Sequence, residues 1–177
     1  TPGELEVVIP PNGRRVLATD ATGEVVVRSV TVSSDQPLSG VIVFAAPFGL
    51  AGVQATDDFS DGFIGPAERE VPSVRGRDVR SGVAIQNLEE EPKTVVLDLL
   101  DSEGNLLATA EVSIPALGQI SQFVDEFTWT SEIDFTDFRG SIRVVTEDDL
   151  AAVMIQTRPG QFATLPVEEL ISSTTEP

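Results

Sequence analysis

The sequence predicts an all-β fold, an antiparallel β-sandwich in which one complete module is preceded by a partial copy of the same module. Short stretches in which apolar and polar residues alternate recur along the 177-residue chain. Such alternation is typical of β-strands with one buried face, and many short strands at regular spacing indicate a sandwich. A second observation, an internal repeat, indicates that the sandwich is built from repeated units.

The repeat aligns residues 29–55 with residues 141–167 without a gap, at a constant offset of 112 positions, which is 141 minus 29. Six aligned pairs are identical: Ser29 and Ser141, Val32 and Val144, Leu38 and Leu150, Val41 and Val153, Pro47 and Pro159, and Ala51 and Ala163. Further upstream, residues 9–13 resemble residues 114–118 at an offset of 105, which is 114 minus 9. The shared positions are mostly apolar, so the repeat preserves a buried face rather than a ligand site.

The individual strands follow from the alternation. They are expected near residues 5–9, 14–18, 24–33, 38–46, 50–55, 119–124, 139–146, 150–158 and 161–167. Residues 79–86 alternate in the same way and predict another strand. Residues 94–113 predict a hairpin of two β-rich runs, with Gly104 taking a positive φ in its turn.

The repeat and the composition divide the chain into four parts. These are a partial repeat (residues 1–56), a connection (57–70), a complete repeat (71–168) and a flexible linker or tail (169–177). The connection is placed where alternation is poor and Gly, Pro and charged residues are frequent. The tail is rich in Ser and Thr, a composition that does not build a core.

The net charge excludes several classes of partner. The chain has 29 acidic residues against 11 basic ones, and a formal net charge of -18. This charge opposes binding to nucleic acid and to anionic membranes. No apolar run approaches the ~20 residues of a membrane-spanning helix, so no membrane insertion is expected. Cysteine is absent, so no disulfide holds the fold, and an extracellular protein of this kind points to bacteria or archaea.

A family resemblance rests on several segments of the later copy. They are residues 81–88 (SGVAIQNL), 97–104 (LDLLDSEG), 114–115 (IP), 123–127 (FVDEF), 139–144 (RGSIRV) and 150–153 (LAAV). In this order they resemble an Ig-like β-sandwich module that occurs in tandem in secreted bacterial cell-surface proteins. The resemblance covers residues 70–168, and residues 4–55 match the latter half of such a module. It implies an extracellular or cell-surface stalk, adhesive or fibre-building role, and it supplies no catalytic positions.

The first copy lacks any counterpart of residues 79–109, which precede the matching segment in the later copy. Half a sandwich leaves an apolar face and strand edges unpaired, an arrangement that invites pairing with other strands. We expect residues 1–55 to complete their core against the second module or by accepting strands from a neighbouring chain. Equally, the chain can be a fragment of a longer array. The expected partners are therefore other copies or neighbouring repeat modules, in the extreme a filament.

Enzymatic chemistry finds little support in the composition. The chain has no His, Cys or Tyr, so it lacks the usual general bases and tuned nucleophiles. A glycosidase needs only two carboxylates ~5–9.5 Å apart, but nothing in the sequence singles out such a pair. We expect the protein not to be an enzyme.

Calcium is the one cofactor that the acidic residues suggest, because this ion prefers clustered carboxylate and carbonyl oxygens on a turn. The candidate ligands are Asp57, Asp58 and Asp61, whose spacing is not that of an EF-hand loop. A second acidic turn lies at residues 147–149. In both places the alternative is a solvated loop that binds no ion.

Two further groups are candidate interaction residues. Trp129, the only Trp, and Asp134 lie in an aromatic segment where the later copy is longer, so they could bind a glycan; the alternative is a hydrophobic plug that closes the sandwich. Arg75, Arg77 and Arg80 form a basic group in an acidic chain. They could pair with residues 89–91 or 168–169 of another subunit, or neutralise charges within their own molecule.

The functional expectation combines these points. An extracellular structural module for surface assembly or adhesion fits the repeat best. A glycan-binding β-sandwich module of a secreted protein is the alternative, to be distinguished by whether Trp129→Ala abolishes polysaccharide binding.

Overall fold

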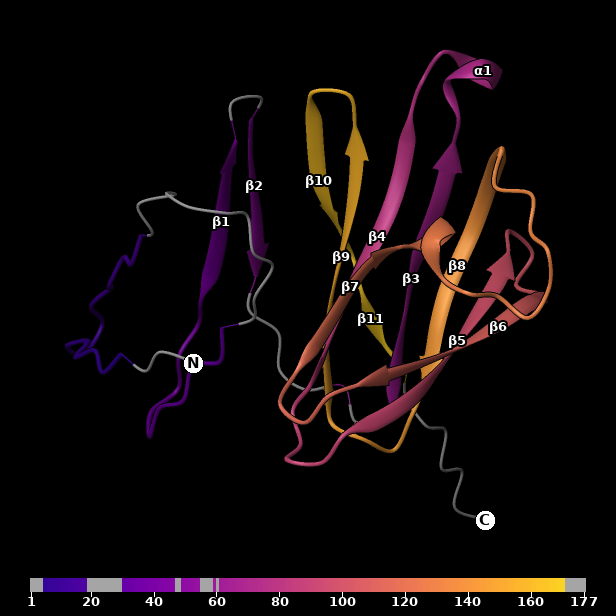
Figure 1. The fold of residues 1–177 in the computed structure, drawn as a ribbon. Coiled ribbons are helices and arrows are strands. Elements are labelled where there is room, and N and C mark those ends of the chain that lie inside the picture. Colours follow the sequence, from indigo (N-terminus) through magenta and orange to yellow (C-terminus); the bar gives the residue numbers. More distant parts are fainter. Residues whose placement is uncertain (1–4, 19–29, 47–48, 55–58, 60, 171–177) are drawn as a thin grey trace.

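A computed structural model describes residues 5–18, 30–46, 49–54, 59 and 61–170. Figure 1 shows a large antiparallel sheet beside a separate two-stranded hairpin. The elements are β1 (Val41–Ala46), β2 (Gly49–Gln54), β3 (Gly62–Glu70), α1 (Pro72–Arg75), β4 (Val79–Asn87), β5 (Lys93–Asp101), β6 (Leu106–Ile114), β7 (Gln119–Phe123), the 3-10 turn η1 (Val124–Glu126), β8 (Asp137–Val145), β9 (Leu150–Arg158), β10 (Gln161–Leu165) and β11 (Glu168–Glu169). The predicted all-β, antiparallel class is confirmed.

The large sheet has the order β10-β9-β4-β3-β8-β5-β6, with β7 paired to β4 and β11 paired to β3. The sheet is not closed into a barrel. Its continuity is weakest between β3 and β4, which share only two residue pairs, whereas β3 pairs with β8 along nine. The sheet therefore has two arms joined at this corner, one containing β10, β9, β4 and β7, the other β11, β3, β8, β5 and β6.

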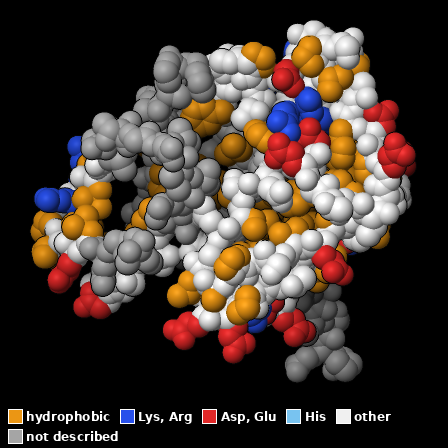
Figure 2. Space-filling model, in the orientation of Figure 1, with side chains coloured by type: hydrophobic (Ala, Val, Ile, Leu, Met, Phe, Trp, Pro, Cys, Tyr) orange, Lys and Arg blue, Asp and Glu red, His pale blue; other side chains and the backbone are white. Residues whose placement is uncertain are grey.

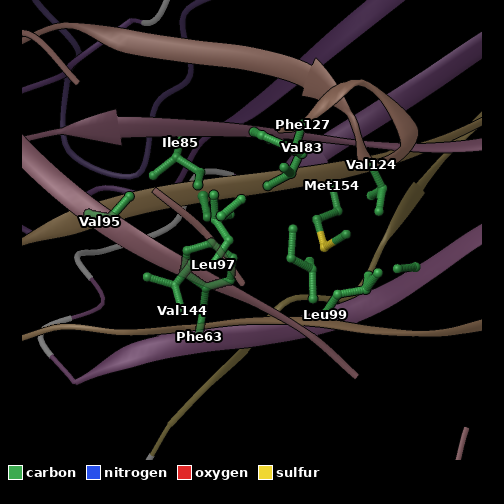
Figure 3. Close-up of a cluster of buried hydrophobic side chains, with 14 of the residues drawn as sticks. Phe63, Val83, Ile85, Val95, Leu97, Leu99, Val124, Phe127, Val144 and Met154 are labelled. Atoms are coloured by element: carbon green, nitrogen blue, oxygen red, sulfur yellow. The ribbon is translucent and has the colours of Figure 1, made fainter. Parts of the chain in front are cut away.

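The two arms enclose one hydrophobic core. Val83, Ile85 and Met154 come from the first arm, and they belong to the same buried cluster as Phe63 and Leu97 of the second. Figure 3 shows these side chains converging between the strands. Burial alternates along the strands, as in β4, where Val83 and Ile85 are buried and Ala84 between them is half-buried. This is the physical result of the period-two pattern read from the sequence.

Most strands of the later copy match the prediction. The expected strands near residues 79–86, 119–124, 139–146, 150–158 and 161–167 are β4, β7, β8, β9 and β10, and the expected hairpin at 94–113 is β5 and β6. Gly104 has φ 85° in the hairpin turn, as predicted. The side chain of Asp101 holds this turn by accepting hydrogen bonds from Asn105 Nδ2 and N and from Glu103 N. The side-chain bond from Asn105 is the main reason why the pKa of Asp101 is lowered.

Among the described residues of the first copy, only those of the hairpin predicted at residues 38–46 and 50–55 form strands, β1 and β2. Residues 5–9, 14–18 and 30–33, the last being the described end of the strand predicted at 24–33, lie in no strand. Their aligned residues in the later copy lie in β6, β7 and β8, which pair with β3, β4 or β5. The prediction was wrong because alternation supplies no partner, and the described part of the first copy contains no counterpart of β3, β4 or β5.

Two further expectations need correction. The connection predicted over residues 57–70 contains β3, because Phe63 and Ala67 point into the core although Gly65 and Pro66 are typical turn residues. The tail predicted from residue 169 also begins too early. Glu169 pairs with Phe63 in β11, and the Leu170 amide donates to the carbonyl of Gly62 at 3.1 Å. Residues 171–177 of the predicted tail lie outside the described residues.

The second match of the repeat, at an offset of 105, reappears as a pair of equivalent turns. The Gly13 amide donates to the Pro10 carbonyl at 2.8 Å, and the aligned Gly118 amide donates to the Pro115 carbonyl at 2.9 Å. The residue before each glycine has a positive φ, 57° at Asn12 and 50° at Leu117. No other described non-glycine residue has a positive φ. The turn is local, so it forms in both copies regardless of strand partners.

Candidate assembly surface

The hairpins β1–β2 and β9–β10 are two copies of one structure. Ile42 pairs with Val53 and Ala46 with Gly49 in the first hairpin. Adding the offset of 112 to these numbers gives Met154 with Leu165 and Arg158 with Gln161, which are the pairs found in the second. All five residue pairs of the β9–β10 ladder have such an equivalent in β1–β2. The repeat read from the sequence is therefore also a repeat of strand register.

The two hairpins lie side by side through β2 and β10. The arrows of β2 and β10 point the same way in Figure 1, so these two strands run side by side in the same direction. Thr164 Oγ1 donates to the Gly52 carbonyl at 3.1 Å, and Gly52 is the residue that aligns with Thr164. The contact thus brings equivalent positions of the two copies together. A contact between two repeat units is therefore already present within one chain.

The copies differ most in the burial of their apolar side chains. The exposed fractions are 69% for Val30 against 0% for Ile142, 72% for Val32 against 0% for Val144, and 49% for Leu38 against 0% for Leu150. In β1, Val41, Ile42 and Val43 are also exposed, whereas Met154, the equivalent of Ile42, is fully buried. Figure 2 shows hydrophobic side chains at the surface of this N-terminal part, at the left of the view. We call residues 30, 32, 38 and 41–43 the apolar surface of the first copy.

The later copy shows what covers such positions. Val144 on β8 lies between Phe63 of β3 and Leu97 of β5 in the sheet. Leu150 and Met154 on β9 belong to the same core cluster. The cover is therefore provided largely by β3, β4 and β5. Grouped exposed apolar side chains are typical of surfaces that contact other proteins.

The predicted arginine group makes contacts within its own chain. Arg77 Nε and Nη2 donate to Glu70 Oε1 and Oε2, both at 3.2 Å, and Glu70 is only 1% exposed. Arg80 Nη2 donates to Asp125 Oδ1 and Glu126 Oε1, each at 2.9 Å. Arg75 ends α1, and its side chain lies outside the described part. For Arg77 and Arg80 this geometry is that of the alternative expectation, in which the arginines neutralise charges within their own molecule.

An ion-pair network that the sequence did not indicate holds the corner between β3 and β4. Arg69 and Arg80 are directly opposite each other in this ladder, a placement that would repel without shared anions. Asp125 accepts from both, through Oδ2 from Arg69 Nε at 3.0 Å and through Oδ1 from Arg80. Partial burial alone would lower the pKa of Arg80, but hydrogen bonds to Asp125 and Glu126 raise it above its usual value. In the sequence, the only sign of such ion pairs is the excess of acidic over basic residues, and this excess does not identify Asp125 as the partner of Arg69 and Arg80.

Trp129 is half-buried and packs against the core. Its ring meets Phe127 edge to face at a centroid distance of 5.8 Å, and its Nε1 donates to the Val124 carbonyl at 2.9 Å. Because the one polar atom of the indole is already bonded, this geometry is that of a hydrophobic plug.

Asp134 is exposed and accepts a hydrogen bond from the Thr136 amide at 2.9 Å. Hydrogen bonds from Thr136 lower its pKa. Asp134 lines an open depression of about 680 Å³, together with the rest of residues 132–136 and with Arg69, Val71 and Asp125. Trp129 does not line it. The two predicted glycan-contacting residues thus do not share one surface pocket.

The calcium prediction falls mostly outside the described residues, which include neither Asp57 nor Asp58. Asp61 is half-buried directly before β3. Among the residues that are described, no three His, Cys, Asp or Glu side chains are grouped so that they could hold a metal ion. In the second acidic turn, Asp148 instead accepts from Lys93 Nζ at 2.6 Å, and Glu89 pairs with the same ammonium group at 2.9 Å. Hydrogen bonds to these two carboxylates raise the pKa of Lys93.

Comparisons of the chain with protein-family models, with curated proteins and with solved structures found no match. Within the described part of the chain, no helix is long and apolar enough to cross a membrane. What stands independently of any resemblance is an all-β, antiparallel protein with an internal structural repeat.

Proposed function

We propose that the protein is a structural β-sandwich module of an extracellular or cell-surface assembly, and that it works by packing against other β-modules rather than by catalysis. The observation that carries this proposal is the contrast between aligned residues, which are exposed in the first copy and buried in the later one. An exposed apolar surface of this kind is costly in water unless a partner covers it. The β2–β10 contact supports the proposal, because it is already an association of two repeat units.

The expected behaviour in solution is self-association that increases with salt. At 0.15 M ionic strength, screening acts over ~8 Å and shortens as salt is added. The repulsion between chains of net charge -18 therefore weakens, while the apolar attraction does not. Light scattering with negative-stain imaging, with and without calcium, would measure the mass and shape. A monomer under all these conditions would contradict assembly.

A pair of variants locates the surface responsible. Ile42→Asp places a charge on the apolar surface of the first copy and should lower the mass of the assembly. Val145→Asp is the matched control, because Val145 is an exposed valine on β8, outside that surface. Equal effects of the two substitutions would mean that association does not depend on the first copy.

Glycan binding is the second candidate, and the depression beside Asp134 is the feature that favours it. Phe135 is its one aromatic lining residue, but this ring is half-buried and packs on Phe138. Binding of a polysaccharide that Asp134→Ala removes and Trp129→Ala retains would place a sugar in the depression. Loss of polysaccharide binding with Trp129→Ala but not with Asp134→Ala would instead place the sugar at the plug formed by Trp129.

A further inference from the structure

Three predicted strands of the first copy do not form in its described residues, and in each case the strands that pair with the equivalent residues of the later copy have no counterpart there. Residues 5–9, 14–18 and 30–33 align with β6, β7 and β8. In the later copy β6 pairs with β5, β7 pairs with β4, and β8 pairs with both β3 and β5. The hairpin β1–β2 forms without these partners, and among the described residues of the first copy it alone forms strands. Within this described part, the absence of one contiguous segment, from β3 to β5, accounts for the differences in strand content.

The equivalence extends to the sequence at the point where such a segment would join. Glu6, Val7 and Ile9 are identical to Glu111, Val112 and Ile114 at the offset of 105. In β6 these residues pair with β5, for example Ile114 with Lys93 and Val112 with Val95. Residues 5–9 therefore retain the pattern of a strand that pairs with β5, without a β5 beside them among the described residues.

We infer that the apolar surface of the first copy is the docking site for a β3–β5-type segment of a neighbouring module, that is, three strands equivalent to β3, β4 and β5 that present apolar residues like Phe63, Val83 and Leu97. This inference rests on the proposed assembly function and names the partner. Such a segment would pair with residues 5–9, 14–18 and 30–33 through strand addition, and its apolar face would cover Val30, Val32 and Leu38. Backbone pairing provides affinity, and the alternating side chains provide register.

An intact second copy of the chain is a poor donor of this segment. Phe63, Leu97 and Leu99 are fully buried in their own core, and β3, β4 and β5 are already paired within the large sheet. Donating them would expose Ile142, Val144 and Leu150 of the donor. The occupant is therefore a β3–β5-type segment whose own second half is absent or is engaged elsewhere.

The test joins the missing segment to the protein. A further copy of residues 59–109 is placed directly before Leu5 of the full chain. Leu5 aligns with Ala110, so Thr109 of the added copy is followed by Leu5 as Thr109 is followed by Ala110 in the later copy. Hydrogen exchange is then measured for the amides of residues 14–18 and 30–33. If the inference holds, these amides exchange at least about a hundredfold more slowly than in the unextended chain, because they become part of a cooperative sheet. Unchanged exchange there, with residues 141–145 still protected, would overturn it.

A matched control keeps the added length and removes the apolar face. The substitutions that correspond to Phe63→Asp and Leu97→Asp are made only in the added copy, and protection should be lost. If protection persisted, burial of the apolar surface would not be its cause and the inference would fail. If the extended chain did not fold, a synthetic polypeptide of residues 59–109 would be added to the unextended chain and the same amides measured, with the same two outcomes.

The result is distinguishable from failure of the assembly function. If light scattering shows oligomers of the unextended chain while the added segment gives no protection, assembly stands and the identity of the partner is wrong. If the added segment protects the first copy but the unextended chain stays monomeric at all salt concentrations, the docking site stands and self-assembly of this chain is wrong.

Discussion

The two copies of the repeat carry the same apolar pattern and reach different structures. In the later copy, Ile142 and Val144 lie in β8, which is paired on both sides, and are fully buried; in the first copy, the aligned Val30 and Val32 are exposed and lie outside any strand. The turn at Asn12 and the hairpin β1–β2 nevertheless form as their equivalents do. Local sequence thus determines the turns and hairpins, whereas the open strands depend on partners brought from distant residues.

The largest difference between the two copies is expected when the same leucine side chain is truncated to alanine at aligned positions. Leu150→Ala should reduce the free energy of unfolding by about 2–5 kcal/mol, because it removes a fully buried side chain. Leu38→Ala at the aligned position should change it by less than about 0.5 kcal/mol, since Leu38 is exposed. Urea denaturation followed by the fluorescence of the single Trp129 measures both. Similar losses would show that the first copy has a core of its own in solution.

A second test concerns β3, one of the three strands that have no counterpart in the described part of the first copy. Glu70→Gln keeps the shape of the side chain and removes the negative charge that accepts two hydrogen bonds from Arg77. The free energy of unfolding should therefore fall by about 1–3 kcal/mol. Glu132→Gln, at an exposed position, serves as the control and should have little effect. Equal values from denaturation would mean that the buried carboxylate does not stabilise the corner between β3 and β4.

The equivalent turns permit an exchange between copies. Leu117→Asn introduces the residue type found at Asn12, and asparagine tolerates a positive φ better than leucine. Because Leu117 is exposed, little burial is lost, and the free energy of unfolding should rise by about 0.5 kcal/mol. The reverse change, Asn12→Leu, should leave unfolding of the later copy unaffected. A decrease with Leu117→Asn would show that the leucine side chain makes a contact that outweighs its backbone strain.

The smallest expected effect is a change in pH dependence at the β5–β6 turn. The pKa of Asp101 is lowered in the folded protein, so its contribution to stability is complete above the usual Asp value of about 3.9 and declines as the pH falls through the folded pKa. Asn105→Ala removes the main hydrogen-bond donor, and NMR titration should show the pKa of Asp101 rising toward its usual value. Asp134, whose pKa is lowered by Thr136, is the internal control and should not move.

Much of the fold could be predicted from periodicity alone, because alternation and turn residues are local signals. The β9 strand was predicted with its observed bounds, and the hairpin turn at Gly104 was predicted with its positive φ. The strand β3 was hidden because Gly65 and Pro66 resemble a turn. Conversely, residues 14–18 were predicted to form a strand, but no described strand pairs with them. Both failures arise from long-range pairing, which a local pattern does not contain.

The candidate surface was only partly predictable. The repeat indicated that half of a module is missing, and this led to an expected apolar surface on the first copy. The ion pairs were not accessible in the same way. Arg80 stands out in the sequence because basic residues are rare, but its partner Asp125 lies 45 positions away among many other carboxylates. Likewise, the plug-like contacts of Trp129 depend on Val124 and Phe127 reaching the same end of the core.

The parallel alignment of β2 and β10 has a consequence for larger structures. Because β2 and β10 run in the same direction, any assembly that repeats this contact would be polar, with these strands all running one way. Its two ends would differ in chemistry, and growth at the two ends would proceed at different rates. A label attached beside the β9–β10 turn, at Gly160, would then mark every subunit along a single direction in electron micrographs.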